Sequence, residues 1–191
     1  MLMKIIIQRH GEPDIGEWKK VPSSEMAKWI KCYNESGVVV NHKPCPVSID
    51  HAKNSFVVCS TLERSKHSAR LLGADDFLSE SFFCEEELPV ANIPLLKISP
   101  HSWSIIFQIL WFLGLSTKVE SKKSILNRVK AASKRLEDLA EEHESILLVG
   151  HGIMNSLIGK ELVQRGWRGE VAPNGKKYRG YSYWEYSVLV K

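Results

Sequence analysis

The sequence predicts a three-layer α/β/α sandwich around a mostly parallel β-sheet. Three short apolar runs, 3–8, 56–59 and 146–149, have the continuous hydrophobic pattern of strands that are buried on both faces. Helical patterns over 62–72 and 153–162 follow the second and third runs directly. Strands that alternate with helices are typical of parallel sheets with crossover connections.

Two further helices are predicted between the second and third strands. The first is apolar and lies near 103–113, and the second is charged and covers about 119–142. The apolar residues of the second helix are spaced for one buried face: Ile125, Val129, Ala132, Leu136 and Leu139. The run 181–190 alternates weakly, which predicts a final edge strand whose direction, parallel or antiparallel, stays open.

Composition indicates one ordinary globular domain. The chain has 191 residues, of which 43% are hydrophobic and 25% charged, and it contains no repeat or linker-like segment. We therefore expect a single domain over 1–191, with a Pro-punctuated helical segment inserted at about 89–118 near the ligand site. The net charge of +4 is too small to argue for nucleic-acid binding, but it suits a small anionic substrate.

Cysteine spacing and the N-terminus favour a cytoplasmic protein with free thiols. The four cysteines form no C-x-x-C pair, and the first residues continue into a strand pattern instead of a signal peptide. The longest apolar stretch, 105–115, is shorter than the roughly 20 residues that a membrane-spanning helix needs. No membrane span is expected.

Polar clusters follow all three predicted strands. Arg9-His10-Gly11 ends the first strand, Arg64 follows the second, and Gly150-His151-Gly152 follows the third. Ligands of open α/β sheets bind at the carboxyl ends of the strands. We therefore expect these clusters to form one site.

The residue types in these clusters suit phosphoryl transfer. A neutral imidazole at His10 is a nucleophile, and Arg9 and Arg64 carry planar, permanently charged groups that match phosphate oxygens. His151 precedes a helix whose first amides favour anions. Taken alone, Arg64 could be a surface residue and His151 a helix cap, but their combination favours the functional interpretation.

An ordinary phosphate ester also needs a proton for its departing oxygen. The run Glu85-Glu86-Glu87 is the obvious source, because crowding and partial burial both raise carboxyl pKa values. A solvated acidic patch is the ordinary interpretation of such a run. Residue patterns alone do not choose among the three carboxyls.

The motifs resemble those of the histidine phosphatase superfamily, also called the phosphoglycerate mutase-like family. The opening motif is matched by 7–12 (Ile-Gln-Arg-His-Gly-Glu), the second arginine motif by 60–65 with 68–69 (Ser-Ala), and the second histidine motif by 149–152. Order and spacing agree over most of the chain. The resemblance implies the phosphoglycerate mutase-like fold.

The resemblance also implies an activity, that of a histidine acid-type phosphatase (a phosphoric monoester hydrolase). His10 would be phosphorylated in turnover, while Arg9, Arg64 and His151 would hold the phosphate, with neither a metal nor a cofactor. An acidic residue precedes a Leu-Pro in broad phosphatases of the family. Glu85 is our preferred match to that residue, with Glu86 and Glu87 as alternatives.

Departures from the family pattern argue against mutase activity. Pro13 and Asp14 follow Glu12 where many relatives have Thr or Ser and an Asn-rich stretch, and the chain is short for a mutase. The expected partner is a small phosphorylated substrate, with a homodimer left open. A phosphohistidine protein phosphatase and a non-catalytic phosphate-binding protein are the rival functions.

Two segments each allow two interpretations. The stretch 103–115 is apolar nearly all round, which favours a core or dimer helix over an apolar lid on the substrate. The stretch 167–183 is rich in Gly and basic residues. A loop or hairpin is the favoured interpretation, and a basic flap that recruits substrate is the alternative.

Overall fold

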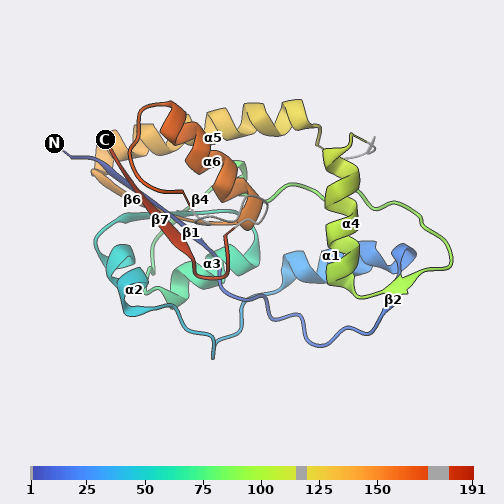
Figure 1. Ribbon diagram of the computed structural model, residues 1–191. Coiled ribbons are helices and arrows are strands. Elements are labelled where there is room, and N and C mark those ends of the chain that lie inside the picture. The colour runs from blue at the N-terminus through green and yellow to red at the C-terminus, as the bar shows by residue number, and fades with distance from the viewer. Residues whose placement is uncertain (1, 115–119, 172–180) are drawn as a thin grey trace.

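The computed structural model describes residues 2–114, 120–171 and 181–191. Its centre is a five-stranded sheet with the strand order β4-β3-β6-β1-β7 (Figure 1). The strands are β1 (Lys4–Arg9), β3 (Phe56–Cys59), β4 (Leu78–Ser79), β6 (Ser145–Gly150) and β7 (Tyr186–Val190). The first four are mutually parallel and β7 pairs antiparallel with β1. The mostly parallel sheet and the edge strand near the C-terminus are therefore confirmed, and the edge strand is antiparallel.

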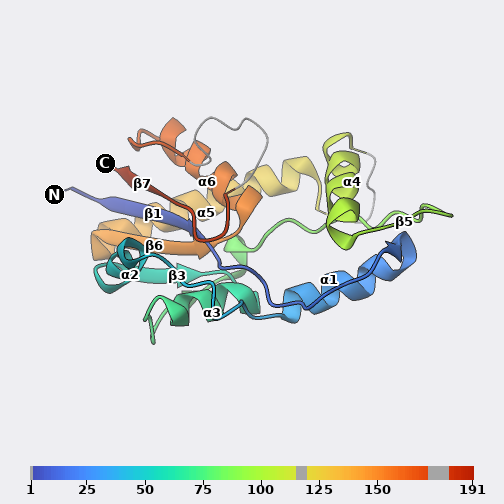
Figure 2. The same cartoon turned by 60° about the horizontal axis from the view of Figure 1, so that its bottom comes forward.

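Helices cover both faces of this sheet. Helices α5 (Lys122–His143) and α6 (Gly152–Gln164) pack on one face, and α2 (Pro46–Lys53) and α3 (Glu63–Leu71) pack on the other (Figure 2). Successive residues of β1 alternate between these layers, so that Ile5 and Ile7 contact the first layer and Ile6 the second. Because each strand residue is buried on one side or the other, the strands read as continuous apolar runs.

Helix α5 shows the buried face that its residue spacing predicts. Its five predicted core residues, Ile125, Val129, Ala132, Leu136 and Leu139, are all buried. The hydroxyl of Ser121 caps the helix by accepting the N–H of Ser124. The crossover through this helix returns the chain to β6, which lies between β3 and β1.

A second, smaller core lies beside the sheet, between α1 (Met26–Glu35) and α4 (Pro100–Phe112). Trp103 and Phe107 of α4 are fully buried in it, and the indole N–H of Trp103 donates to the carbonyl oxygen of Val21 over 2.8 Å. The core interpretation of the apolar helix therefore holds for these two residues. Leu115 and the end of the 89–118 segment lie outside the described residues, and the single domain over 1–191 stays a prediction.

The segment 12–55, for which the sequence predicted no element, contains α1, α2 and a short 3-10 helix, Ser23–Glu25. It also contains β2 (Val21–Pro22), which pairs with β5 (Lys97–Ile98) in a separate antiparallel ribbon. A second 3-10 helix, Ser81–Phe83, follows β4.

No helix within the described residues combines the length and the apolar character needed to cross a membrane. Most of the basic stretch predicted as a loop or flap, residues 172–180, lies outside the described residues.

Candidate active site

The fold brings the three predicted polar clusters together. Strands β3, β6 and β1 are neighbours in that order, and the three are parallel. Their carboxyl ends therefore share one edge of the sheet, where β1 ends at Arg9 and His151 follows β6. The rings of His10 and His151 lie there edge to face, with their centroids 5.0 Å apart.

His10 is 1% exposed, and its ring is held in one tautomer. Its Nδ1 lies 2.6 Å from the carbonyl oxygen of Gly11. Because a carbonyl oxygen only accepts hydrogen bonds, Nδ1 carries the proton and donates it. The lone pair is consequently on Nε2, which makes no hydrogen bond among the described residues.

Gly11 has to be a glycine because the chain packs closely behind it. A Cβ atom at this position would lie 2.5 Å from the Cζ2 atom of Trp184, which is shorter than any ordinary contact. The N–H of Gly11 donates to the hydroxyl of Ser68 on α3 over 2.9 Å. These contacts fix the peptide that orients His10.

Arg9 lies against the segment that precedes β7. Its Nη1 donates to the carbonyl oxygen of Tyr181 over 2.5 Å, and its guanidinium stands 4.3 Å from the centre of the Tyr183 ring. Such a cation over an aromatic face is favourable and fixes the plane of the guanidinium.

Arg64, only 2% exposed, is held from helix α1. Its Nη1 donates to the carbonyl oxygen of Tyr33 and to Oδ1 of Asn34, over 3.2 and 3.1 Å. Its guanidinium lies 4.4 Å from the centre of the Tyr33 ring. A charged group is seldom buried without a carboxylate partner, and an anionic ligand would supply the missing negative charge.

Three buried donors of the site have no hydrogen-bond partner within the described part of the chain. They are Nε of Arg9, Nε of Arg64 and Nδ1 of His151. Buried donors without partners are rare in proteins, and a ligand, a water or an ion can account for them. A phosphoryl group, with three charged oxygens, would satisfy them.

His151 is oriented by Ser60, the first residue after β3. Its Nε2 lies 2.7 Å from the Ser60 hydroxyl oxygen, which also accepts the N–H of Leu62 over 3.3 Å. When the Ser60 hydroxyl donates its hydrogen to Nε2, the proton of His151 is on Nδ1, which has no partner among the described residues. In that tautomer Nδ1 of the neutral His151 ring is a hydrogen-bond donor.

Both histidines favour the neutral form. Burial, with the charges of Arg64 and Arg9, holds the pKa of His10 well below its usual range. Burial, with the charge of Arg64, does the same to the pKa of His151. A neutral imidazole is the nucleophilic form, so the environment keeps His10 ready to attack near neutral pH.

We expect neither histidine to become protonated as the pH of the ligand-free protein is lowered from about 8 to about 6. Ring NMR resonances of His10 and His151, assigned with His10→Gln and His151→Gln variants, should stay at the neutral position throughout. Because the unfolded chain binds these two protons near pH 6.5 and the folded chain does not, their contribution to stability falls as the pH drops below about 6.5. A titration midpoint between about pH 6 and 7 for either ring would contradict this.

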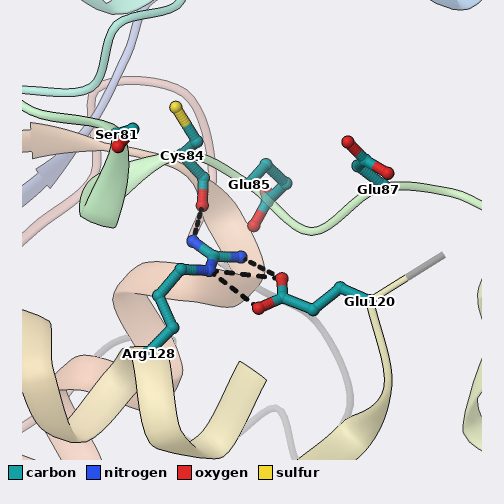
Figure 3. A pocket seen from close by; sticks show the side chains of 6 residues that line it. All are labelled: Ser81, Cys84, Glu85, Glu87, Glu120 and Arg128. Carbon is teal, nitrogen blue, oxygen red and sulfur yellow. Dashed lines mark hydrogen bonds and ion pairs between the residues drawn. The ribbon is translucent and has the colours of Figure 1, made fainter. Parts of the chain in front are cut away.

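The three consecutive glutamates occupy three different environments. Glu85 accepts the N–H groups of Met154 and Ile153, at 2.8 and 3.3 Å, so its carboxylate lies at the N-terminus of α6, next to His151. Its charge also acts on Arg64. Glu87 is exposed and, with Glu85, lines a cavity of about 270 Å³ (Figure 3).

Glu86 is 6% exposed, and its carboxyl lies beside that of Glu85. Burial and the neighbouring charge of Glu85 raise its pKa well above the usual range. The structure therefore brings Glu85 to the N-terminus of α6 beside His151, while burial of Glu86 favours the protonated form of its carboxyl.

No group of three or more His, Cys, Asp or Glu with metal-binding geometry occurs among the described residues. All four cysteines are free thiols, as their spacing predicted. The donors described above suit an anion.

Several residues of the site were missed by sequence reasoning. Tyr33 and Asn34 come from a helix that the sequence analysis did not predict, and Tyr183 precedes β7. Ser60 directly follows a strand, as His10 does, and that position was a signal for the site.

Comparison with known proteins gives the fold a name. No protein-family model matches the sequence, and no curated protein is detectably similar to it. Among solved structures, a mycobacterial glucosyl-3-phosphoglycerate phosphatase is 15% identical with a TM-score of 0.62, covering 100% of this chain and 91% of its own. The product of open reading frame Rv3214 of Mycobacterium tuberculosis is 14% identical with a TM-score of 0.62, and the alignment covers 97% of this chain and 90% of that protein. The α-ribazole phosphatase of Shigella flexneri is 21% identical with a TM-score of 0.51, and the alignment covers 97% of this chain and 89% of that protein.

These likenesses confirm that the chain has the phosphoglycerate mutase-like fold that the motifs predicted.

Proposed function

We propose that this protein is a phosphatase that hydrolyses phosphomonoesters through a covalent phosphohistidine on His10, without a metal ion. The observation that carries the proposal is the locked tautomer of His10, whose Nδ1 donates to Gly11 while Nε2 keeps its lone pair. The partnerless donors of Arg9, Arg64 and His151 support a phosphoryl group as the ligand. Neighbouring structures support the same class, because they include phosphatases, and one of these was solved with inorganic phosphate.

In the first half of the proposed reaction, Nε2 of His10 attacks phosphorus as the bond from phosphorus to the ester oxygen breaks. Arg9 and Arg64 stabilise the charge on the three phosphoryl oxygens. In this step Glu85 acts as the carboxylic acid, having bound a proton as the anionic ester entered the site, and it gives that proton to the departing oxygen, so that a neutral alcohol leaves. His10 then carries the phosphoryl group on Nε2 and keeps its proton on Nδ1, where the Gly11 carbonyl stabilises the positive ring.

In the second half, water attacks the phosphorus of phosphohistidine and the nitrogen–phosphorus bond breaks. The Glu85 carboxylate, now ionised, takes the proton from that water, which returns the carboxyl to its starting state. Inorganic phosphate leaves and His10 is neutral again. Hydrolysis, rather than mutase transfer to a second hydroxyl, is the proposed outcome.

The first experiment is release of inorganic phosphate from para-nitrophenyl phosphate and a panel of phosphorylated metabolites, in the presence of a metal chelator. We expect chelator-resistant hydrolysis of at least the aryl ester, whose leaving group needs little protonation. Activity confined to a phosphohistidine-containing protein would indicate the rival phosphoprotein phosphatase. No turnover on either kind of substrate, with phosphate still bound, would leave only a binding function.

A further inference from the structure

We infer that Arg128 of helix α5 is a positioning residue that holds Glu85 at the start of helix α6. The inference rests on the proposed function, in which Glu85 is the proton donor. Arg128 is not one of the residues that we propose to bind the phosphoryl group at the strand ends.

Arg128 holds the backbone on the N-terminal side of Glu85. Its Nη1 donates to the carbonyl oxygen of Cys84 over 2.6 Å and to that of Phe82 over 3.1 Å. The same nitrogen lies 3.8 Å from the sulfur of Met154, whose backbone N–H donates to Glu85. Arg128 therefore contacts both the segment that carries Glu85 and the helix turn that receives its carboxylate.

Glu120 fixes Arg128 in this position. Its two carboxylate oxygens accept hydrogen bonds from Nε and Nη2, the shortest of them 2.6 Å, and both side chains are less than one-fifth exposed (Figure 3). Hydrogen bonding to Arg128 lowers the pKa of Glu120. A two-pronged pair of this kind defines the plane of the guanidinium and leaves Nη1 to hold the backbone.

The pair with Glu120 also argues against Arg128 as a phosphate ligand. Its charge is already matched by a carboxylate, whereas Arg9 and Arg64 have no carboxylate partner among the described residues. The same cavity of about 270 Å³ is lined by Glu85, Glu120 and Arg128. The ion pair and the carboxyl of Glu85 are therefore parts of one cavity wall.

This geometry predicts a selective defect in an Arg128→Met variant. If the Cys84 peptide is released, the carboxyl of Glu85 is no longer held at α6, and a displacement of about 1 Å costs up to roughly 100-fold in rate. The loss should fall on kcat/KM for an alkyl phosphate, whose leaving oxygen needs the proton. Aryl phosphates with good leaving groups should lose less than about 3-fold.

The matched control is Arg135→Met. Arg135 lies two turns further along α5 and forms the same kind of two-pronged pair with Glu80. Within the described part of the chain it makes no hydrogen bond to the backbone next to Glu85. It should leave the ratio of alkyl to aryl activity unchanged. Arg128→Lys, which keeps the charge but cannot form all these hydrogen bonds at once, should fall between wild type and Arg128→Met.

A double-variant cycle completes the test. Glu85→Gln with Arg128→Met should lose no more alkyl activity than Glu85→Gln alone, because the second change acts only through the first residue. Equal losses on both substrate classes, a selective loss in Arg135→Met, or additive losses in the cycle would overturn the positioning role. Unaltered activity in His10→Ala would instead overturn the proposed function itself.

Discussion

His10→Ala should lower the rate of phosphate release by about 10,000-fold or more and abolish covalent labelling of the protein. The variant removes Nε2, the atom to which the phosphoryl group is transferred in the proposed reaction. No other side chain of the described site offers a substitute, because Nε2 of His151 is already engaged with Ser60. The fold should survive, since the core layers on both faces of the sheet do not depend on the His10 ring.

The measurement is rapid quenching of the enzyme with a phosphate ester carrying ³²P, followed by a test of the label's stability. Phosphorus bound to an imidazole nitrogen is lost in acid and retained in alkali. His101→Ala is the control, because His101 is an exposed histidine at the start of α4, and it should label normally. A labelled His10→Ala protein would move the nucleophile to another residue.

The central sheet could be predicted from the sequence because its strands are buried on both faces. Residues 56–59 and 146–149 read as unbroken apolar runs, a pattern that is typical of strands in a sheet covered by two helical layers. Helix α1 was missed although Met26, Trp29, Ile30 and Tyr33 follow helical spacing. Its apolar face packs on α4 in the second core and not on the sheet, so the helix is not flanked in the sequence by a predicted strand.

The same logic explains which site residues were predictable. Arg9, His10 and His151 stand at strand ends, where topology alone brings distant parts of the chain together. Arg128 belongs to a charged amphipathic helix, and its residue type and spacing match those of any solvent-facing arginine. Its role depends on hydrogen bonds to the backbone at Cys84, which no sequence pattern encodes.

Glu85→Gln should slow hydrolysis of alkyl phosphates by about 100-fold to 1,000-fold and that of activated aryl phosphates by far less. The amide keeps the size of the side chain but has no acidic proton to donate. The measurement is the dependence of kcat/KM on the acidity of the leaving alcohol, which should become steeper in the variant. Equal losses across the series would remove the acid role from Glu85.

Glu86→Gln is the matched comparison, because it makes the same change one residue along. The carboxyl of Glu86 is buried and its pKa is raised. Over the pH range between the pKa of this carboxyl in the unfolded chain and its higher pKa in the folded protein, the folded protein holds a proton that the unfolded chain has lost. The free energy of unfolding therefore falls as the pH rises through that range. An uncharged glutamine removes this penalty, so Glu86→Gln should stabilise the protein above about pH 5 and leave the leaving-group dependence unchanged. If Glu86→Gln produced the selective loss instead, the buried acid, and not the carboxyl at the helix terminus, would be the proton donor.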